Sequence, residues 1–586
     1  MNGNDLLWSR GGSCGSLDFS LASDDLELSR ISLLLFPSLG ADAALSFASS
    51  MLTDDGDTIR MRQAVICELL EYPGLAEALR RLLDMLGEME SCYRGVMDNP
   101  AGLRVTRMDA AMDGMKKAVL RLERNLSQQA ADILEENAAD NRYAQLFRFT
   151  HFRRRLCELY TRSLTLLRDT LGKLNVQSVP LRTLRNWAEE CSRRDRLDHA
   201  ADTLQKLESE WQGVNAFAID VCLDSRRMVV ELEVAETRSG LYARKGMLEA
   251  AGTEEERDGI TTLMNFPQSG SGVLFQEYLL SQVGYEIRGF LTKQRDVLVK
   301  LPVSGVEELR SIRDALLFYT GAAAFAEKLR SRGSSVCAPT LSEDTVFRFK
   351  GARLPEQTCT GTLPVANDLT LEPGGSILLT GPNSSGKTCF LIMAGQFFFL
   401  GQLGCLLPAE EAAFSPRDRL LTLFAAGESE TGEDSRMGLE VQRIRLLQEQ
   451  MSPRSILLFN EPMTSTSAAE GARICTELLT DLGRKGIPAL LVTHFNHIWP
   501  ALSSSFADIG LSQKLHSLVM TTEETPDGVH YLYKLKEAPP PPSSHAHAVV
   551  AEKGLRLEDM LAGLQSRGLD MRPDASGWAL IRNGII

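Results

Sequence analysis

The stretch from Ser376 to Met393, which reads SILLTGPNSSGKTCFLIM, constrains the fold of this 586-residue chain more than any other. Residues 381–388 match the pattern G-x-x-x-x-G-K-S/T at every fixed position. An apolar, β-prone run, Ser376–Thr380, precedes them, and helix-compatible residues follow from Cys389. A strand, a glycine-rich loop and a helix in this order predict a phosphate-binding P-loop inside an α/β domain.

The P-loop predicts how the chain holds a nucleotide. Its glycines let backbone N–H groups converge on the phosphates, Lys387 reaches the β- and γ-phosphates, and the Thr388 hydroxyl binds Mg²⁺. The predicted cofactors are therefore ATP and Mg²⁺. The residues assigned to nucleotide binding here are Gly381, Pro382, Asn383, Ser384, Ser385, Gly386, Lys387, Thr388 and Cys389.

A second apolar run, Ser455–Asn460, predicts the strand that leads to the catalytic acid. Glu461 follows it directly and is expected to orient or deprotonate the attacking water. Asn460 stands where such sites usually have an acid. Because its amide is neutral, we expect weak Mg²⁺ binding or slow turnover. The predicted metal ligands are Thr388, Asn460 and Glu461.

A third apolar run, at residues 489–493, ends just before His494. An imidazole at this place in the strand order is expected to sense the γ-phosphate, because it responds to the presence or loss of that group. We therefore predict Glu461 and His494 as the catalytic residues.

Outside this region the chain is mostly helical. One helix is expected to stop at Pro73 and a second to run from Leu75 to Met89. Apolar residues then recur at heptad spacing at Met108, Met112, Met115, Val119, Leu122 and Leu126. They predict long paired helices, either in a compact bundle or in an extended arm. The period changes at residues 216–235, which predict a β-hairpin, and a helix is expected at 306–332.

Charge and cysteine content limit the classes of function. The net charge is −14, so any contact with nucleic acid must come from a local basic surface. Residues 151–200 are a candidate, with eleven Lys or Arg against six acids, and a solvated helix face is the alternative. Eleven cysteines without C-x-x-C pairs favour reduced thiols and argue against structural zinc.

We expect neither a secretion signal nor a membrane span. The N-terminus lacks a basic segment followed by an apolar one. The apolar stretch at 389–409 contains Gln396 and Gln402 and follows the P-loop, where a helix packed on a sheet is apolar all round. It predicts a buried helix, and the expected location of the protein is the cytoplasm.

Five segments, in this order, resemble the ATPase domain of the MutS family of DNA-mismatch-repair proteins. They read NDLTLEPGGSILLTGPNSSGKT, GCLLPAEEAAFSPRDRLLTLF, GESETGEDSRMGLEVQRIRLL, SILLFNEPMTSTSAAEG and LLVTHFNHI. The resemblance covers residues 356–536, while residues 58–350 resemble the helical core, lever and clamp of the family more loosely. It is closest to the short bacterial MutS-like branch.

The resemblance implies roles for further residues. Ser435 matches the signature-loop serine that such ATPases present to the γ-phosphate of a partner subunit. Asn367 matches an asparagine that lies near the adenine. Thr466 and Ser467 lie in the loop that crosses the dimer interface of the family.

The chain also departs from the family pattern. Pro364 stands where an aromatic residue usually stacks on adenine, and Met463-Thr-Ser-Thr-Ser replaces a glycine-rich crossing loop. Only about 60 residues precede the core region, so we expect the N-terminal mismatch-recognition domain to be missing. Recognition of mismatches is therefore left open.

The expected fold is an α+β multidomain chain. A mostly α-helical core and lever with an inserted β-hairpin clamp is followed by an α/β P-loop ATPase domain of the ABC type. The expected boundaries are 1–95 for a helical segment and the start of the core, 96–285 for the lever with its clamp at 214–238, 286–355 for the returning core, 356–538 for the ATPase domain, and 539–586 for a proline-rich linker and tail with one helix at 555–566.

The function implied by the resemblance is that of a homodimeric, ATP-dependent clamp. It would bind double-stranded DNA, hydrolyse ATP and act with downstream proteins in DNA mismatch repair, other DNA repair or recombination. Two alternatives stay open. A slowly hydrolysing, nucleotide-gated interaction protein is suggested by Asn460. An ABC-type ATPase with a membrane partner is the other, although residues 435–440 do not match the L-S-G-G-Q signature of that class.

Overall fold

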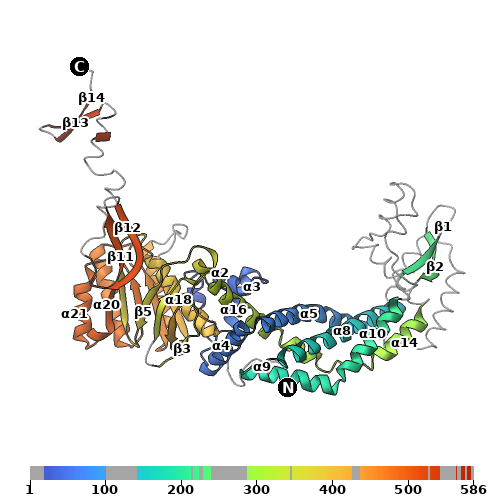
Figure 1. Cartoon of the computed structure of the whole chain (residues 1–586). Helices are drawn as coiled ribbons and strands as arrows, with labels where there is room; N and C mark the ends of the chain where they lie inside the picture. The colour runs from blue at the N-terminus through green and yellow to red at the C-terminus, as the bar shows by residue number, and fades with distance from the viewer. Residues whose placement is uncertain are drawn as a thin grey trace. The chain divides into compact units, whose positions relative to one another are not determined.

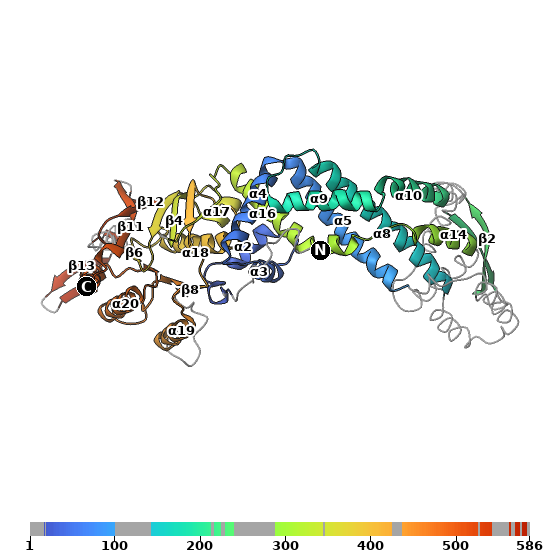
Figure 2. The same cartoon turned by 90° about the horizontal axis from the view of Figure 1, so that it is seen from below.

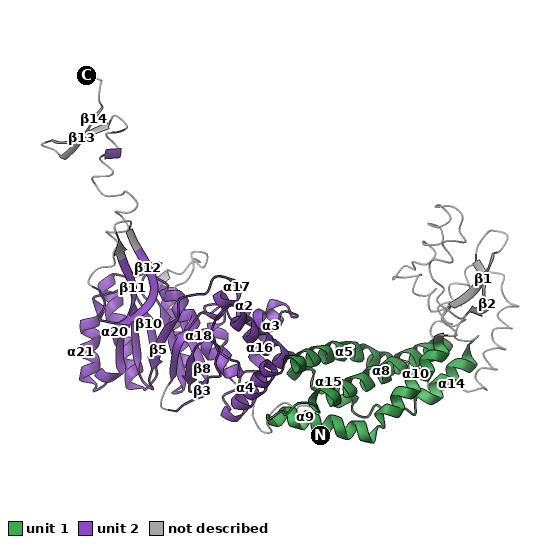
Figure 3. Ribbon diagram, in the orientation of Figure 1, with its two compact units in different colours: residues 1–7, 73–316 green, residues 8–72, 317–586 purple. Residues whose placement is uncertain are grey.

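The computed structural model describes most of the chain, in two compact units. One unit comprises residues 1–7 and 73–316, and the other comprises residues 8–72 and 317–586 (Figure 3). The described residues are 17, 19–99, 142–212, 216–223, 229–238, 287–343, 346–424, 436–525, 528–541, 562, 563, 566, 569–574 and 577–582. The predicted heptad seam at 108–126 and the predicted site residue Ser435 lie outside them. The fold is mixed α/β, with helices and two mixed sheets.

The larger sheet of the second unit has six strands in the order β12-β11-β6-β10-β9-β8. Figure 1 labels β11 and β12 of this sheet. Their bounds are Ser376–Thr380 for β6, Arg419–Phe424 for β8, Ser455–Asn460 for β9, Ala489–Val492 for β10, Leu515–Thr525 for β11 and Gly528–Glu537 for β12. Only β12 runs antiparallel to its neighbour. Every residue of β6 and β10 is buried, because parallel central strands are covered on both faces. The three strands predicted from the sequence are confirmed.

Helices cover this sheet. They are α18 (Lys387–Leu403), α19 (Arg436–Gln450), α20 (Ala468–Arg484) and α21 (Ile498–Asp508). Nearly all of α18 is buried, as predicted for a helix that is apolar all round. Within the described ranges, no helix is both long enough and apolar enough to cross a membrane.

A smaller sheet packs phenylalanines against α18. Its strands lie in the order β3-β7-β4-β5, with bounds Thr340–Leu341 for β3, Phe347–Ala352 for β4, Asn367–Leu371 for β5 and Glu411–Phe414 for β7. The ring of Phe347 lies 4.5 Å from that of Phe398, and the ring of Phe349 lies 5.4 Å from that of Phe397. These contacts hold the helix that follows the P-loop in place.

Segments from the N-terminal part of the chain complete the second unit. They are η1 (Ser20–Ala22), α2 (Leu28–Leu35), α3 (Ala41–Ser50) and α4 (Gly56–Glu71), and α17 (Pro355–Thr360) lies beside α2. The buried Arg62 of α4 donates hydrogen bonds to the carbonyls of Met51 and Leu403. Gln396 donates to the carbonyl of Leu26. The bonds from Arg62 to Leu403 and from Gln396 to Leu26 join residues more than 300 positions apart in the sequence.

The first unit is built around one long helix. Its helices are α5 (Pro73–Met97), α8 (Arg142–Leu171), α9 (Val179–Arg194), α10 (Leu197–Gln212), α14 (Arg288–Leu298) and α15 (Val306–Ser311). Helix α8 has 30 residues, about 45 Å at about 1.5 Å per residue, and it contacts α5, α9, α10 and α14 (Figure 2). Long packed helices were predicted here, but α5 exceeds the predicted range Leu75–Met89 at both ends.

Two further predictions can be compared with the structure. The predicted helix at 306–332 is broken at Ile312 into α15 and α16 (Arg313–Ser331), and the chain passes between the units within α16. The predicted hairpin is confirmed as antiparallel strands β1 (Ala216–Leu223) and β2 (Val229–Arg238).

The C-terminal region contains a second hairpin that the sequence did not predict. Strands β13 (Leu569–Asp574) and β14 (Gly577–Arg582) pair antiparallel. The helix predicted at 555–566 is described only at residues 562, 563 and 566, which are helical.

Candidate nucleotide site

The strands β6, β10 and β9 bring their following loops to one edge of the larger sheet. These three strands are parallel neighbours, and Val492 at the end of β10 pairs with both Leu379 and Asn460. Because parallel strands end at the same edge, the P-loop, Glu461 and His494 all follow strands that end there. This is the arrangement expected from the sequence.

The backbone of the P-loop adopts conformations that favour glycine. The φ angle is 146° at Gly381, 94° at Gly386 and 64° at Ser384. A β-carbon added to Gly381 would lie 2.9 Å from the β-carbon of Met520, which is closer than real contacts allow. The two pattern glycines are therefore required by the local geometry.

Lys387 is buried against its own loop. Its Nζ donates to the carbonyls of Gly381, at 3.0 Å, and Pro382, at 2.9 Å. It lies 3.8 Å from a carboxylate oxygen of Glu461. Burial lowers the pKa of Lys387, and the Glu461 carboxylate opposes that change. An ammonium has three N–H donors, so one remains for a phosphate oxygen.

A buried hydroxyl in the same loop fits a phosphate ligand. The side-chain oxygen of Ser385 is buried, and no described residue offers it a hydrogen-bond partner. Buried polar groups of this kind are normally satisfied, and an unpaired one has a free-energy cost of about 1–3 kcal/mol. A phosphate oxygen would satisfy this donor.

Thr388 and Asn460 lie close enough to share a metal ion. The Thr388 hydroxyl donates to the amide oxygen of Asn460 at 3.2 Å, across the P-loop and the end of β9. Both offer neutral oxygen atoms, which suit Mg²⁺ together with phosphate oxygens and water. In the described part of the chain, no group of three or more His, Cys, Asp or Glu residues is placed so that it could hold a metal ion.

The predicted catalytic residues are held by their backbones. Glu461 has φ at 51°, a left-handed value for a non-glycine residue, and its N–H donates to the carbonyl of Val492 at 2.8 Å. His494 is exposed, and its ring lies 4.5 Å from the ring of the buried Phe495. The exposed imidazole of His494 thus packs against the buried ring of Phe495. Cys389, in the first turn of α18, is also exposed.

Asn367 uses its side chain inside the protein. Its amide nitrogen donates to the carbonyl of Tyr533 at 2.9 Å, and its amide oxygen accepts from the N–H of Leu535 at 2.8 Å. These bonds fasten the start of β5 to β12. The structure therefore gives Asn367 a positioning role for β12, and its predicted place near an adenine stays a prediction.

Tyr533 is a candidate site residue that the sequence analysis missed. A β-carbon built on Gly386 would lie 3.1 Å from its ring, so the ring borders the P-loop. Tyr533 is 46% exposed and has φ at 53°, and its ring centroid lies 6.3 Å from that of Tyr531. The alternation Tyr531-Leu-Tyr533 near the end of the domain was the only sequence signal for it.

The loop after Glu461 is anchored at several points. Met463 has φ at 61° and a buried side chain in the main core, although a left-handed backbone is unfavourable for such a residue. The Ser465 hydroxyl donates to the carboxylate of Glu440 at 2.6 Å, and Glu440 is only 5% exposed. The Ser467 side chain caps α20 by accepting from the N–H of Glu470. Glu440 lies on α19, so its bond ties that helix to the loop after Glu461.

Comparisons with known proteins agree with this geometry. Residues 377–555 match the family model of MutS domain V. A DNA mismatch repair protein MutS from Chloroflexus aurantiacus is 31% identical over 199 residues, which are 33% of this chain and 20% of that protein. The protein of the same name from Parasynechococcus marenigrum is 26% identical over 498 residues, 82% of this chain and 51% of that protein. The chain thus spans between a fifth and about half of the length of these relatives.

Proposed function

Because the chain belongs to the MutS family, we propose that it is an ATPase whose nucleotide state controls its grip on double-stranded DNA. The observation that carries this proposal is the convergence of Lys387, Thr388, Asn460 and Glu461 at one edge of the larger sheet. The family relatives are named for DNA mismatch repair, and we infer a role for this chain in DNA repair or recombination.

The proposed hydrolysis uses charge placement rather than a covalent step. The P-loop N–H groups and the remaining N–H of Lys387 would bind the β- and γ-phosphates. Thr388 and Asn460 would hold Mg²⁺, which neutralises the charge that develops on the phosphate oxygens. Glu461 would orient the attacking water, and His494 would contact the γ-phosphate from the end of β10.

We infer that Tyr533 takes the place of the missing aromatic residue at Pro364. Its half-exposed ring beside Gly386 offers a flat apolar face where an adenine bound with its phosphates on the P-loop could stack. The bonds from Asn367 to the backbone of β12 support this ring position. Substituting Tyr533 by Ala should weaken ATP binding more than it weakens tripolyphosphate binding.

We further propose that two copies of the chain close around ATP. Each P-loop would face the signature-loop serine, Ser435, of the partner, and closure would bring the helical units and their hairpins around a duplex. The bond between Glu440 and Ser465 supports a link between the partner-facing helix α19 and the catalytic loop. Loss of ATP-dependent dimerisation in a Ser435→Ala variant would support this arrangement.

Asn460 favours a second candidate, a switch that binds ATP and hydrolyses it slowly. Its neutral amide provides less attraction for Mg²⁺ than a carboxylate would. Single-turnover hydrolysis by Asn460→Asp separates the two candidates. Faster hydrolysis than in the parent supports a slowed switch, and an unchanged or lower rate supports an ordinary ATPase.

The experiment that tests the main proposal measures hydrolysis and DNA binding together. ATP turnover is followed with and without duplex DNA, and DNA binding is followed by fluorescence anisotropy with and without ATP and Mg²⁺. Turnover that depends on Lys387 and Glu461, with DNA affinity that changes with nucleotide, is the expected result. DNA binding that is unmeasurable at low salt in every nucleotide state would reject it.

A further inference from the structure

The arginines of residues 151–200 fall into two groups. Those on α8 already have partners: Arg154 pairs with Glu208, Arg155 with Glu88 and Arg162 with Glu158, while Arg153 donates to the carbonyls of Leu298 and Leu301. The contacts of Arg153, Arg154 and Arg155 hold α8 to its neighbours, whereas the pair of Arg162 with Glu158 lies within α8. Charge in this group is therefore mostly used for structure.

The second group lies on α9 and on the turn after it, and it excludes Arg194 of α9, which pairs with Asp195. Arg182, Arg185, Arg193 and Arg196 have no carboxylate within 4.0 Å among the described residues. Residues 182, 185, 189 and 193 recur every three or four positions, so they share one face of α9. Arg182, Arg193 and Arg196 are exposed. Within residues 151–200, only this part places several arginines without a carboxylate partner along one helix face.

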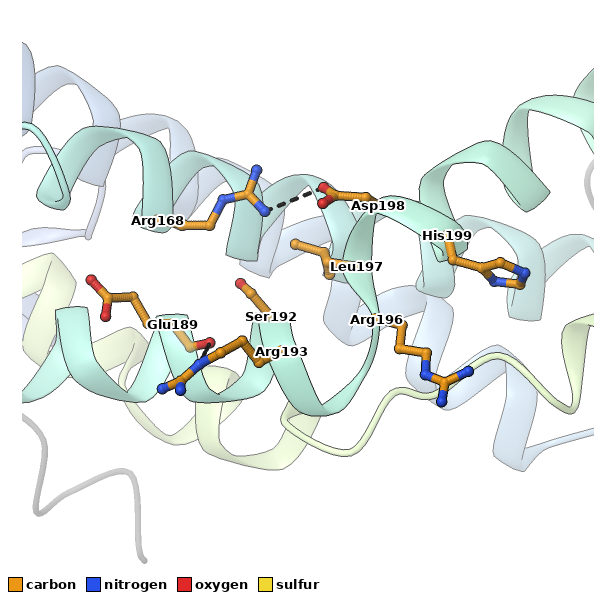
Figure 4. Close-up of a pocket in the computed structure, with 8 residues that line it drawn as sticks. All are labelled: Arg168, Glu189, Ser192, Arg193, Arg196, Leu197, Asp198 and His199. Carbon is orange, nitrogen blue, oxygen red and sulfur yellow. Dashed lines mark hydrogen bonds and ion pairs between the residues drawn. The ribbon is translucent and has the colours of Figure 1, made fainter.

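A groove at the corner between α9 and α10 contains part of this row. Its volume is about 440 Å³. It is lined by Arg168, Glu189, Ser192, Arg193, Arg196, Leu197, Asp198 and His199 (Figure 4). Arg168 forms an ion pair with Asp198, with a guanidinium nitrogen 3.3 Å from a carboxylate oxygen, so those two charges compensate each other. Helix α10 begins at Leu197, and its positive N-terminal end therefore opens onto the same groove.

The corner is rigid because a buried carboxylate holds it. Asp195, between α9 and α10, accepts hydrogen bonds from Tyr160 at 2.6 Å, from Ser304 at 2.8 Å and from Arg194 at 3.1 Å. Tyr160 in turn accepts from the N–H of Gly305. Arg193 and Arg196 thus project from a fixed backbone, which lowers the entropy lost when they bind a ligand.

We propose that this groove and the arginine row of α9 bind the phosphate backbone of duplex DNA. This inference rests on the proposed function and names one place where the helical unit grips the duplex. The step from Arg182 to Arg193 covers eleven residues, about 16 Å at about 1.5 Å per residue. That length matches about five base pairs at about 3.4 Å each. A row of this length fits a polymer of phosphates better than one small anion.

Glu189 is the one acid of the groove whose carboxylate has no basic partner among the described residues, although its backbone carbonyl accepts a hydrogen bond from Arg193 at 3.4 Å, and it lies on the same face of α9 as the row. A carboxylate there repels phosphate, so its removal should strengthen binding. Removing this carboxylate should therefore raise DNA affinity, whereas removing the arginines should lower it. Glu189→Gln keeps the size of the side chain and should raise DNA affinity about twofold to threefold at low salt.

The main test compares two double variants of the full chain. Arg193→Gln with Arg196→Gln removes two groove cations. Arg80→Gln with Arg81→Gln, on α5 of the same unit, removes one half-buried and one exposed cation that already pair with Glu77. Binding of a fluorescent duplex is measured by anisotropy between about 50 and 200 mM KCl. Thermal unfolding and DNA-free ATP turnover check that the variants are otherwise intact.

We expect the groove variant to lose at least about tenfold in affinity at low salt, with a salt slope shallower by about two. The α5 variant should bind like the parent. Equal losses in both variants, or a groove variant within about twofold of the parent, overturn the groove assignment but leave the proposed function standing. Displacement of DNA by submillimolar tripolyphosphate from the parent but not from the groove variant would assign the groove to a small anion instead. If the parent does not bind duplex DNA at all, the groove assignment and the proposed function both fail.

Discussion

The P-loop and the α9 row hold their cations in opposite ways, although both are expected to meet phosphates. Lys387 is buried and already bonded to two carbonyls of its own loop. Arg193 and Arg196 are exposed and have no carboxylate partner among the described residues. A buried, prearranged donor binds a phosphate group at one fixed position. An exposed row of cations attracts any extended series of negative charges, whatever its exact position. Specific chemistry is therefore expected at the P-loop, and salt-dependent DNA binding is expected at the α9 row.

The largest expected effect is the loss of ATP turnover when the buried lysine of the P-loop is removed. Lys387→Ala removes the buried donor and should lower ATP turnover by about a hundredfold to a thousandfold, the usual cost of losing one prearranged donor. DNA binding without nucleotide should stay within about twofold of the parent, since the arginine row is untouched. Steady-state turnover and anisotropy measure the two effects. Equal damage to both activities would mean that the two sites are not separate.

The next effect separates binding from chemistry at the same site. Glu461→Gln keeps the size of the side chain but removes the base, so hydrolysis should fall by about a hundredfold while ATP affinity changes by less than about threefold. Single-turnover hydrolysis and equilibrium binding of a fluorescent ATP analogue give the two numbers. An unchanged single-turnover rate would remove Glu461 from the catalytic role.

The third effect concerns the stability of the corner that carries the arginine row. Burial raises the pKa of Asp195, but the hydrogen bonds from Tyr160, Ser304 and Arg194 outweigh it, and the net pKa is lowered. A lowered native pKa stabilises the fold above the unfolded pKa of about 3.9 and loses that contribution as pH falls through the native value. Asp195→Asn should therefore cost about 2 kcal/mol at neutral pH.

Urea unfolding from neutral to acid pH measures this cost. The difference between Asp195→Asn and the parent should begin to shrink near pH 4, where the unfolded chain is protonated, and should vanish only below the lowered native pKa of Asp195. A difference that stays constant across this range would mean that the carboxylate charge does not stabilise the corner. A matched Asp198→Asn variant, whose side chain is exposed, should show a much smaller cost.

A smaller effect tests the link between α19 and the catalytic loop. Ser465→Ala removes the hydrogen bond to the Glu440 carboxylate, and turnover should fall about fivefold, which corresponds to about 1 kcal/mol. Thr466→Ala is the control. The Thr466 hydroxyl donates to the exposed Glu470 at 3.1 Å, so its loss should change turnover by less than twofold, about 0.4 kcal/mol. Equal rates in both variants would remove the link.

The smallest effect is expected at an exposed ion pair of the helical unit. Arg162 lies 3.6 Å from Glu158 and is 63% exposed, so Arg162→Ala should change the free energy of unfolding by less than about 0.5 kcal/mol. Urea unfolding at two salt concentrations measures it. A loss above about 1 kcal/mol would show that the paired arginines of α8 carry more of the stability than exposed pairs usually do.

The backbone of the P-loop and the strand ends beside it could be predicted largely from the sequence because their requirements are local, while the roles assigned to their residues stay predictions. Eight consecutive residues determine the glycine conformations and the positions of Lys387 and Thr388, and each apolar run ends next to its polar residue. Tyr533 could not be found in this way. It reaches the loop only because β12 folds back beside β11 and β5 through bonds to Asn367.

In the helical unit, a count of charged residues in the sequence could not tell which arginines are free to bind a ligand. The sequence predicted a basic surface over residues 151–200, but α8 uses its arginines against acids far away in the chain, such as Glu88 for Arg155. Only tertiary contacts identify the unpaired arginines on α9. The predicted helices and the hairpin were easier to find, because periodicity within a segment depends only on which face is buried.

The measurement closest to the central claim is the affinity for a fluorescent duplex, with and without a slowly hydrolysed ATP analogue and Mg²⁺, in the parent and in Lys387→Ala. We predict that nucleotide changes the affinity of the parent by at least about fivefold, or about 1 kcal/mol of coupling, and leaves the variant unchanged. Equal affinity of the parent in both nucleotide states, or the same change in the variant, would contradict the proposal that ATP at the P-loop controls the grip on DNA.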